Sequence, residues 1–138
     1  MKYDATLPWR DIKREGFNDH IGPIRFAEVA EHDFRVALAL DDRHMNSAGV
    51  CHGGVLMSVA DSGMGTAAFT TAGSAVATID FECDFLAAAK NGQLLHGVCS
   101  VARAAREFLF MEGDFYAGER RVLRASGIWV VRSRRQQQ

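Results

Sequence analysis

The sequence predicts an α+β domain in which one long buried helix is followed by antiparallel strands. Phe34, Val36, Leu38 and Leu40 alternate with Arg35 and two alanines, a pattern typical of a half-buried strand. From Val55 to about Ala72 the chain is apolar almost throughout, which is too long for a strand and indicates a buried helix. Alternation then returns and continues almost to the end of the chain. We therefore expect an antiparallel sheet of about five strands with its helices on one face.

The length and composition indicate one domain over residues 1–138. The chain has 138 residues, of which 48% are apolar and 24% charged, enough for one core and too few for two. No stretch approaches the roughly 20 apolar residues that span a bilayer, and the first residues do not form a secretory signal. We expect a cytoplasmic protein with no membrane partner. Three cysteines without a CxxC pair, and histidines without metal spacing, predict no disulfide framework, metal or cofactor.

The remaining elements follow from local signals. Thr6-Leu7-Pro8 is typical of a helix start and Gly16 of a helix end, so a short helix is expected in the N-terminal extension 1–16. After the long helix, a strand is predicted whose apolar positions are Ala77, Ile79, Phe81, Cys83 and Phe85, with Thr78, Asp80, Glu82 and Asp84 between them. Runs at roughly 93–104, 107–117 and 121–132 complete a four-strand meander. Residues 133–138 are expected to form a frayed tail.

The acid Asp61 stands out in the long helix. A helix that is apolar all round must be covered on all sides, as by a sheet curled around it. Burying an unpaired carboxylate there costs several kcal/mol unless its pKa rises or donors bond to it. A structural role, with Asp61 bonded to a nearby serine or water, is one explanation. Gly53-Gly54 suggests another, because a helix's first turn offers unpaired N–H groups, aided by the helix dipole, to a polarised carbonyl.

Asn46 and His52 flank this helix start with side chains that can bond to a carbonyl or to each other. Taken singly, Asn46 could be a turn residue and His52 an ordinary loop histidine. Taken together, the pattern N-x5-HGG-x6-D, on a helix between one strand and four, closely resembles the hotdog-fold acyl-CoA thioesterases of the phenylacetate-degradation (PaaI-like) type. Thr78-Ile79-Asp80-Phe81 shares the resemblance, which covers about residues 17–132.

This resemblance implies a mechanism and an assembly. The Gly53 N–H, with Asn46, would hold a thioester carbonyl while His52 steadies the arrangement and Gly54 lies against the substrate. Asp61 would act as general base toward water or as nucleophile, and Thr78 would position the water. The family forms homodimers and commonly tetramers. Two departures are modest: Ala104-Ala105-Arg106 replaces an expected hairpin glycine, and threonine stands where serine is common.

Three other functions fit the sequence less well. A Cys51 thiol nucleophile is disfavoured, because adjacent residues in an extended loop point apart and no orienting group accompanies Cys51 and His52. A hotdog-fold enoyl- or hydroxyacyl-CoA hydratase-dehydratase would share the helix terminus, histidine and acid, but its GDxNPxH-like signature is absent. A non-catalytic acyl-CoA-binding protein would not need an acid near the thioester, so Asp61 disfavours this function.

Charge is unevenly distributed along the chain. Residues 1–102 carry 8 Lys/Arg and 13 Asp/Glu, whereas residues 103–138 carry 8 Arg and 4 acids. No nucleic-acid motif accompanies this basic third, so a phosphorylated ligand such as CoA is the simpler partner, and a solvated strand face is the alternative. The candidates for phosphate contacts are Lys90, Arg103, Arg106, Arg120, Arg121 and Arg124.

Helix geometry predicts how the acid and the carbonyl site meet. Asp61 lies seven residues beyond Gly54, or about 10 Å along the helix. Reacting groups must lie within about 3 Å, or one water, of the reacting carbon. We therefore expect a two-fold dimer with two shared sites, each taking Asn46, His52 and Gly53 from one chain and Asp61 from the other.

Overall fold

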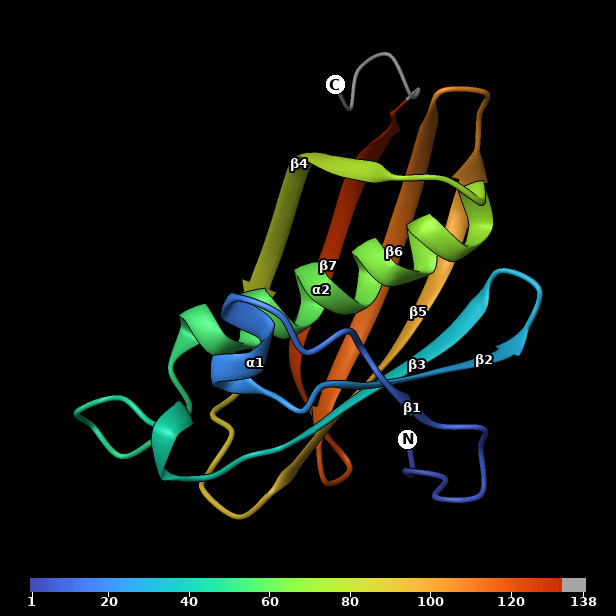
Figure 1. The fold of residues 1–138 in the computed structure, drawn as a ribbon. Helices are drawn as coiled ribbons and strands as arrows, with labels where there is room; N and C mark the ends of the chain where they lie inside the picture. Colours follow the sequence, from blue (N-terminus) through green and yellow to red (C-terminus); the bar gives the residue numbers. More distant parts are fainter. Residues whose placement is uncertain (133–138) are drawn as a thin grey trace.

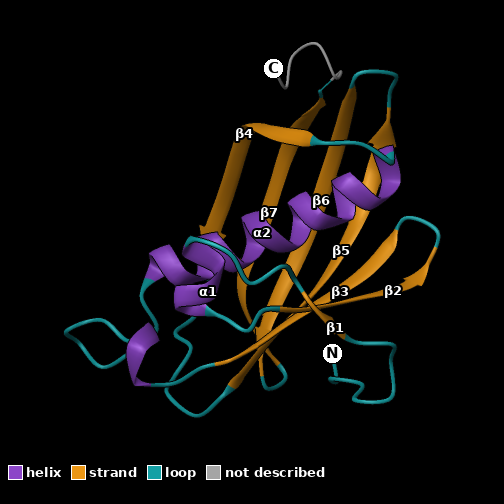
Figure 2. Cartoon of the chain, in the orientation of Figure 1, coloured by secondary structure: helices purple, strands orange, loops and turns teal. Residues whose placement is uncertain are grey.

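The computed structural model describes residues 1–132 and has one long helix, α2 (Gly53–Ala72), lying across one face of a seven-stranded sheet (Figure 1). Every strand pair is antiparallel, in the order β1-β2-β3-β5-β6-β7-β4. Helices and sheet form two layers, with the core between them (Figure 2). The predicted α+β class and the long helix are confirmed. No helix within residues 1–132 is both long and apolar enough to cross a membrane.

The elements after residue 33 agree with the sequence analysis to within a few residues. β3 spans Asp33–Ala39 and a short 3-10 turn covers Asp42–His44. After α2 come β4 (Val76–Phe85), β5 (Leu94–Ala104), β6 (Phe108–Ala117) and β7 (Arg120–Val131). The predicted tail 133–138 lies outside the described residues.

The N-terminal part differs from the prediction. Two further strands, β1 (Arg10–Asp11) and β2 (Arg25–Ala30), raise the count from about five to seven. The sequence does not predict β2, because a register shift between Glu28 and Ala30 breaks the alternation of its side chains. The only α-helix of the described chain before α2 is α1 (Phe17–Ile21), which begins after Gly16 rather than ending there.

The predicted helix between Thr6 and Gly16 is wrong for a local reason. The Asp4 carboxylate accepts hydrogen bonds from the Thr6 N–H at 2.9 Å and from the Thr6 hydroxyl at 2.6 Å. The Trp9 indole donates to the Asp4 carbonyl at 2.9 Å. These bonds close a turn in place of a helix cap. The chain then runs extended, so that Asp11 pairs with Arg25.

The order of the last four strands also differs. β5, β6 and β7 form a meander, but β4 pairs with β7 at the far edge of the sheet instead of preceding β5. The predicted four-strand meander is therefore wrong for β4. Within the described chain, β4 has a partner on one side only, and its other edge is unpaired.

β4 contains a bulge that reverses which side chains face the helix. Thr78 pairs with Trp129 and Asp80 with Ile128, so Ile79 is an extra residue. Side chains opposite each other share a face, which places Thr78 on the inner face with the buried Trp129. The predicted alternation is right after the bulge, where Phe81 and Cys83 pack against the core. It is wrong at Ile79 and before it, where Val76 and Thr78 face inward, because the extra residue shifts the two parts of the strand relative to each other.

α2 packs on the sheet along one face rather than being covered on all sides. Its buried residues recur three and four apart, as expected for one helical stripe: Leu56, Val59, Ala60, Gly63, Met64, Ala67 and Ala68. Met57 and Phe69, on other faces, are exposed in the single chain. Gly63 allows the closest approach, because a Cβ there would lie 2.4 Å from Val36 Cγ2 of β3.

We predict that Gly63→Ala lowers the free energy of unfolding by about 1–3 kcal/mol, because its methyl group would overlap Val36 and force the helix from the sheet. Denaturant unfolding followed by circular dichroism measures the change. Gly65→Ala is the matched control, since a Cβ there meets only the Trp129 ring at 3.1 Å. It should change stability by less than about 1 kcal/mol. Equal stability of Gly63→Ala and the wild type would contradict this packing.

Candidate active site

A cleft of about 490 Å³ lies between the N-terminal segment, α2 and the adjoining parts of β4 and β7. Asp61 of α2 and Thr78 of β4 both line it. Much of the remaining wall is apolar, from Ile12, Phe69 and Val76. The structure thus places two of the predicted site residues in a cavity of the size that small ligands occupy.

The Asp61 carboxylate accepts a hydrogen bond but has no ion-pair partner within residues 1–132. The Thr78 hydroxyl donates to Asp61 Oδ1 at 2.8 Å. Within residues 1–132 no cation forms an ion pair with Asp61 and no other side chain bonds to Oδ2. The side chain is partly exposed through the cleft, so the fully buried acid expected from the sequence is not observed. A carboxylate fixed at one oxygen and open at the other can accept a proton or attack a carbon.

The start of α2 presents one amide without an acceptor. His52 is the N-cap, and its Nδ1 accepts from the Gly54 N–H at 2.8 Å. The amides of Cys51, His52, Val55 and Leu56 also have acceptors. That of Gly53 has none in the described chain. A side chain at residue 53 would press on the Phe85 ring, 3.1 Å from an ideal Cβ. The helix therefore offers the Gly53 N–H to a bound oxygen.

Asn46 shapes the loop that leads to this helix. Its Oδ1 accepts hydrogen bonds from the Ala48 N–H at 2.9 Å and the Val50 N–H at 3.2 Å. Its amide nitrogen bonds to no acceptor within residues 1–132. Asn46 is thus a turn residue that keeps a free donor, so the structural and functional interpretations are compatible.

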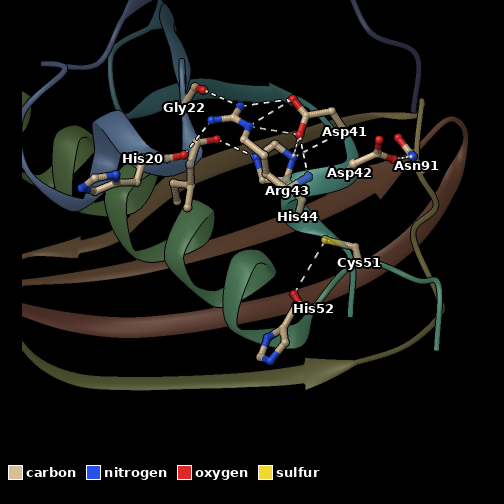
Figure 3. A network of polar contacts seen from close by, with 10 residues as sticks. His20, Gly22, Asp41, Asp42, Arg43, His44, Cys51, His52 and Asn91 are labelled. Carbon is tan, nitrogen blue, oxygen red and sulfur yellow. Dashed lines mark hydrogen bonds and ion pairs between the residues drawn. The ribbon is translucent and has the colours of Figure 1, made fainter. Parts of the chain in front are cut away.

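A polar network fixes the preceding segment (Figure 3). The Arg43 guanidinium donates to the His20 carbonyl at 2.6 Å and the Gly22 carbonyl at 3.0 Å, and also bonds to Asp41. The buried His44 bonds through Nε2 to the Ile21 carbonyl at 2.7 Å. The His44 carbonyl in turn accepts from the His52 N–H at 2.8 Å. The helix start is thereby tied to α1.

The structure separates the predicted residues into two groups. Asp61 and Thr78 face the cleft, whereas Asn46, His52 and Gly53 lie at the helix start and do not line it. The basic candidates Lys90 and Arg103 do not line it either. Three further residues that the sequence did not indicate line the cleft: Arg10, Lys13 and Trp129. Arg10 and Lys13 lie in the segment where a helix was expected, so no pattern pointed to them.

Cys51 lacks the properties of a nucleophile. It is buried, and this burial raises the pKa of its thiol to about 11. The neighbouring His52 side chain is exposed and bonded to Gly54 instead. The thiol is therefore protonated at neutral pH. Residues 1–132 contain no group of three His, Cys, Asp or Glu side chains that could hold a metal ion.

Comparisons with known proteins identify the family of this chain. Residues 48–124 match the model of the thioesterase superfamily. A Pseudomonas aeruginosa protein named as a candidate esterase, PA0474, is 33% identical over 113 residues, covering 80% of this chain and 84% of its own.

Solved structures share the fold at low sequence identity. The Escherichia coli PaaI protein, from the phenylacetic acid degradation operon, superimposes with a TM-score of 0.78 at 20% identity, over 84% of this chain and 83% of its own. A hypothetical thioesterase of Streptococcus pneumoniae, solved with coenzyme A, gives 0.73 at 20% identity, over 80% and 86%. With its hotdog fold and the superfamily match over more than half its length, this chain belongs to the thioesterase superfamily and is a thioester hydrolase.

Proposed function

We propose that this protein hydrolyses acyl-CoA thioesters to a free acid and CoA, in sites shared between two chains. The observation that carries the proposal is the Asp61 carboxylate, fixed by Thr78 at 2.8 Å and open to a largely apolar cleft. The cleft suits an acyl group, and the acid suits attack on its carbonyl. CoA is the expected carrier because the Streptococcus pneumoniae relative was solved with coenzyme A. Lys90 and Arg103, both exposed, are candidates for contacts with its phosphates.

The reaction needs an attacking group and a site for the developing oxyanion. As base, Asp61 takes a proton from water, and the resulting hydroxide bonds to the thioester carbon. Thr78, which already donates to Asp61, can accept a hydrogen bond from that water. The negative charge moves to the carbonyl oxygen, where the Gly53 N–H and the Asn46 amide donate. Collapse breaks the C–S bond, and the CoA sulfur takes up the proton. As nucleophile, Asp61 would instead form an anhydride that water then opens.

A second chain would complete this arrangement. Gly53 and Asp61 lie on one helix, with Asp61 about 10 Å beyond Gly54. A partner α2 running antiparallel would bring its own helix start to each Asp61. The unpaired edge of β4 supports such pairing, because apolar residues lie exposed there and on α2. Ile79 is 56% exposed, Phe85 55% and Phe69 52%.

We predict that Asp61→Asn lowers kcat at least about a hundredfold with little change in KM, because the shape is kept and only the base or nucleophile is lost. Steady-state release of CoA thiol measures both constants. Thr78→Ser, which keeps the hydroxyl, should retain most activity. Single-turnover hydrolysis in oxygen-18 water separates the two roles, since label enters the Asp61 side chain only if it is the nucleophile. If Asp61→Asn kept half the wild-type kcat, Asp61 would have a structural role and not a catalytic one.

Mixing two inactive variants tests the shared site. Asn46→Asp keeps the oxygen that bonds to Ala48 and Val50 and removes the amide donor, so the loop should survive. Mixed with Asp61→Asn, it should form heterodimers in which one of two sites is intact. Random mixing at equal amounts gives about half mixed dimers, so activity should recover to roughly a quarter of wild type. Heterodimers detected by native mass spectrometry without recovery would overturn sharing.

Thiol chemistry gives an independent check. Because burial raises the pKa of Cys51 to about 11, Cys51→Ala should retain kcat within about threefold at neutral pH. Iodoacetamide should likewise leave the folded wild-type enzyme active. Loss of activity in Cys51→Ala, with an unchanged circular dichroism spectrum, would favour a thiol nucleophile over Asp61.

A further inference from the structure

One indole N–H in the wall of the cleft has no hydrogen-bond partner. Trp129 of β7 is 1% exposed and lines the cleft, with its ring against Phe81 in an edge contact at 6.4 Å between centroids. No atom of residues 1–132 accepts a bond from Nε1. Every fully buried side-chain nitrogen or oxygen in this range has a partner, so Nε1 is not sealed in the core. The donor therefore opens onto the cleft.

Gly65 keeps this donor accessible. A Cβ at Gly65 would lie 3.1 Å from Trp129 Nε1 and would cover it. Asp61, Gly65 and Phe69 recur every four residues along α2, so they face the cleft in succession. Trp129 also lies directly across from Thr78 in the sheet. Gly65, beside the free N–H, is four residues or about 6 Å along the helix beyond Asp61, so the donor and the carboxylate face successive positions of the cleft.

The surroundings determine what this donor can bind. Ile12, Phe69 and Val76 supply an apolar wall beside this donor. A purely hydrocarbon ligand would displace water from the N–H and offer no hydrogen-bond acceptor in its place, which costs binding free energy. Two exposed cations, Arg10 and Lys13, also line the cleft, Arg10 over the Phe26 ring at 4.9 Å and Lys13 beside Glu15 at 3.4 Å. The indole N–H itself is a neutral donor beside an apolar wall, and it suits a neutral oxygen because a carboxylate there would lose more hydration than one hydrogen bond returns.

We propose that Trp129 selects the acyl group, its Nε1–H donating to an oxygen that the acyl group carries beyond the thioester carbonyl, with Gly65 as the residue that leaves room for it. The preferred substrates are then thioesters of hydroxyl- or keto-substituted acids. This inference rests on the proposed thioesterase function. It is distinct from catalysis, because the Gly53 N–H and the Asp61 carboxylate act on the carbonyl itself.

Matched substrates test the selection. Benzoyl-CoA and its ortho-, meta- and para-hydroxy derivatives place an oxygen at increasing distance from the carbonyl, and octanoyl-CoA with β-hydroxyoctanoyl-CoA forms an aliphatic pair. The wild type should prefer at least one hydroxylated member by roughly three- to tenfold in kcat/KM. Replacing Trp129 by benzothienylalanine, which keeps the ring shape without the N–H, should abolish that preference. Gly65→Ala should reduce it by covering the donor.

The outcomes separate the two proposals. The quantity compared is the ratio of kcat/KM between the two members of each pair, which a general loss of activity in either variant leaves unchanged. If the wild type cleaves both members of every pair alike, the selection by Trp129 is wrong while the thioesterase function stands. An equal loss of kcat/KM on both members of a pair in the benzothienylalanine variant also overturns the selection by Trp129, because the N–H would then bond to water or to the thioester carbonyl.

An indole NMR measurement decides the inference even without turnover. The chain has two tryptophans, and Trp9→Phe leaves the indole signal of Trp129 alone. Adding the preferred hydroxylated free acid should move this proton signal downfield, whereas the hydroxyl-free acid should move it much less. Equal shifts with both acids would contradict recognition by Trp129, whatever the hydrolytic activity.

Discussion

The close contact between α2 and the sheet is the constraint on which the site depends. At Gly63 the helix backbone lies so near β3 that a single methyl group would meet Val36 at 2.4 Å. This approach fixes the height of the helix above the strands. Asp61, two residues earlier, can then reach the Thr78 hydroxyl, and Gly65, two residues later, lies against the Trp129 ring. A helix lifted by a larger residue would lose both contacts together.

A second constraint comes from one extra residue in β4. Without the bulge at Ile79, the strand's alternation would place Thr78 on the polar face with Asp80 and Glu82. The bulge turns Thr78 inward, opposite Trp129, while Ile79 points outward and is exposed. The same irregularity therefore supplies the residue that holds the acid and an apolar residue at the open sheet edge. Catalysis and assembly would share one local cause.

Within one chain the site is divided between two ends of a helix segment. The acid faces the cleft, and the Gly53 amide, which has no acceptor within residues 1–132, lies at the helix start outside the cleft. In the proposed reaction both groups act on one thioester, and they would come from two chains because helical rise keeps them about 10 Å apart within one chain. His52 and Asn46 lie beside the free amide because His52 caps the helix by accepting from the Gly54 N–H, and Asn46 closes the preceding loop by accepting from the Ala48 N–H.

The sequence by itself determined the long helix and the strands after it, since these depend on local period, and it singled out the candidate site residues by their spacing along one element. The largely apolar run from Val55 to Ala72 is too long for a strand and predicts a helix, and the step from Gly53 to Asp61 is set by helical rise. Tertiary structure alone decided the N-terminal segment, where Asp4 closes a turn, and the place of β4 beside β7. Tertiary structure also decided the face of β4 on which Thr78 lies and the access from the cleft to the Trp129 N–H. These features depend on register and on contacts between residues far apart in the chain, which no local pattern records.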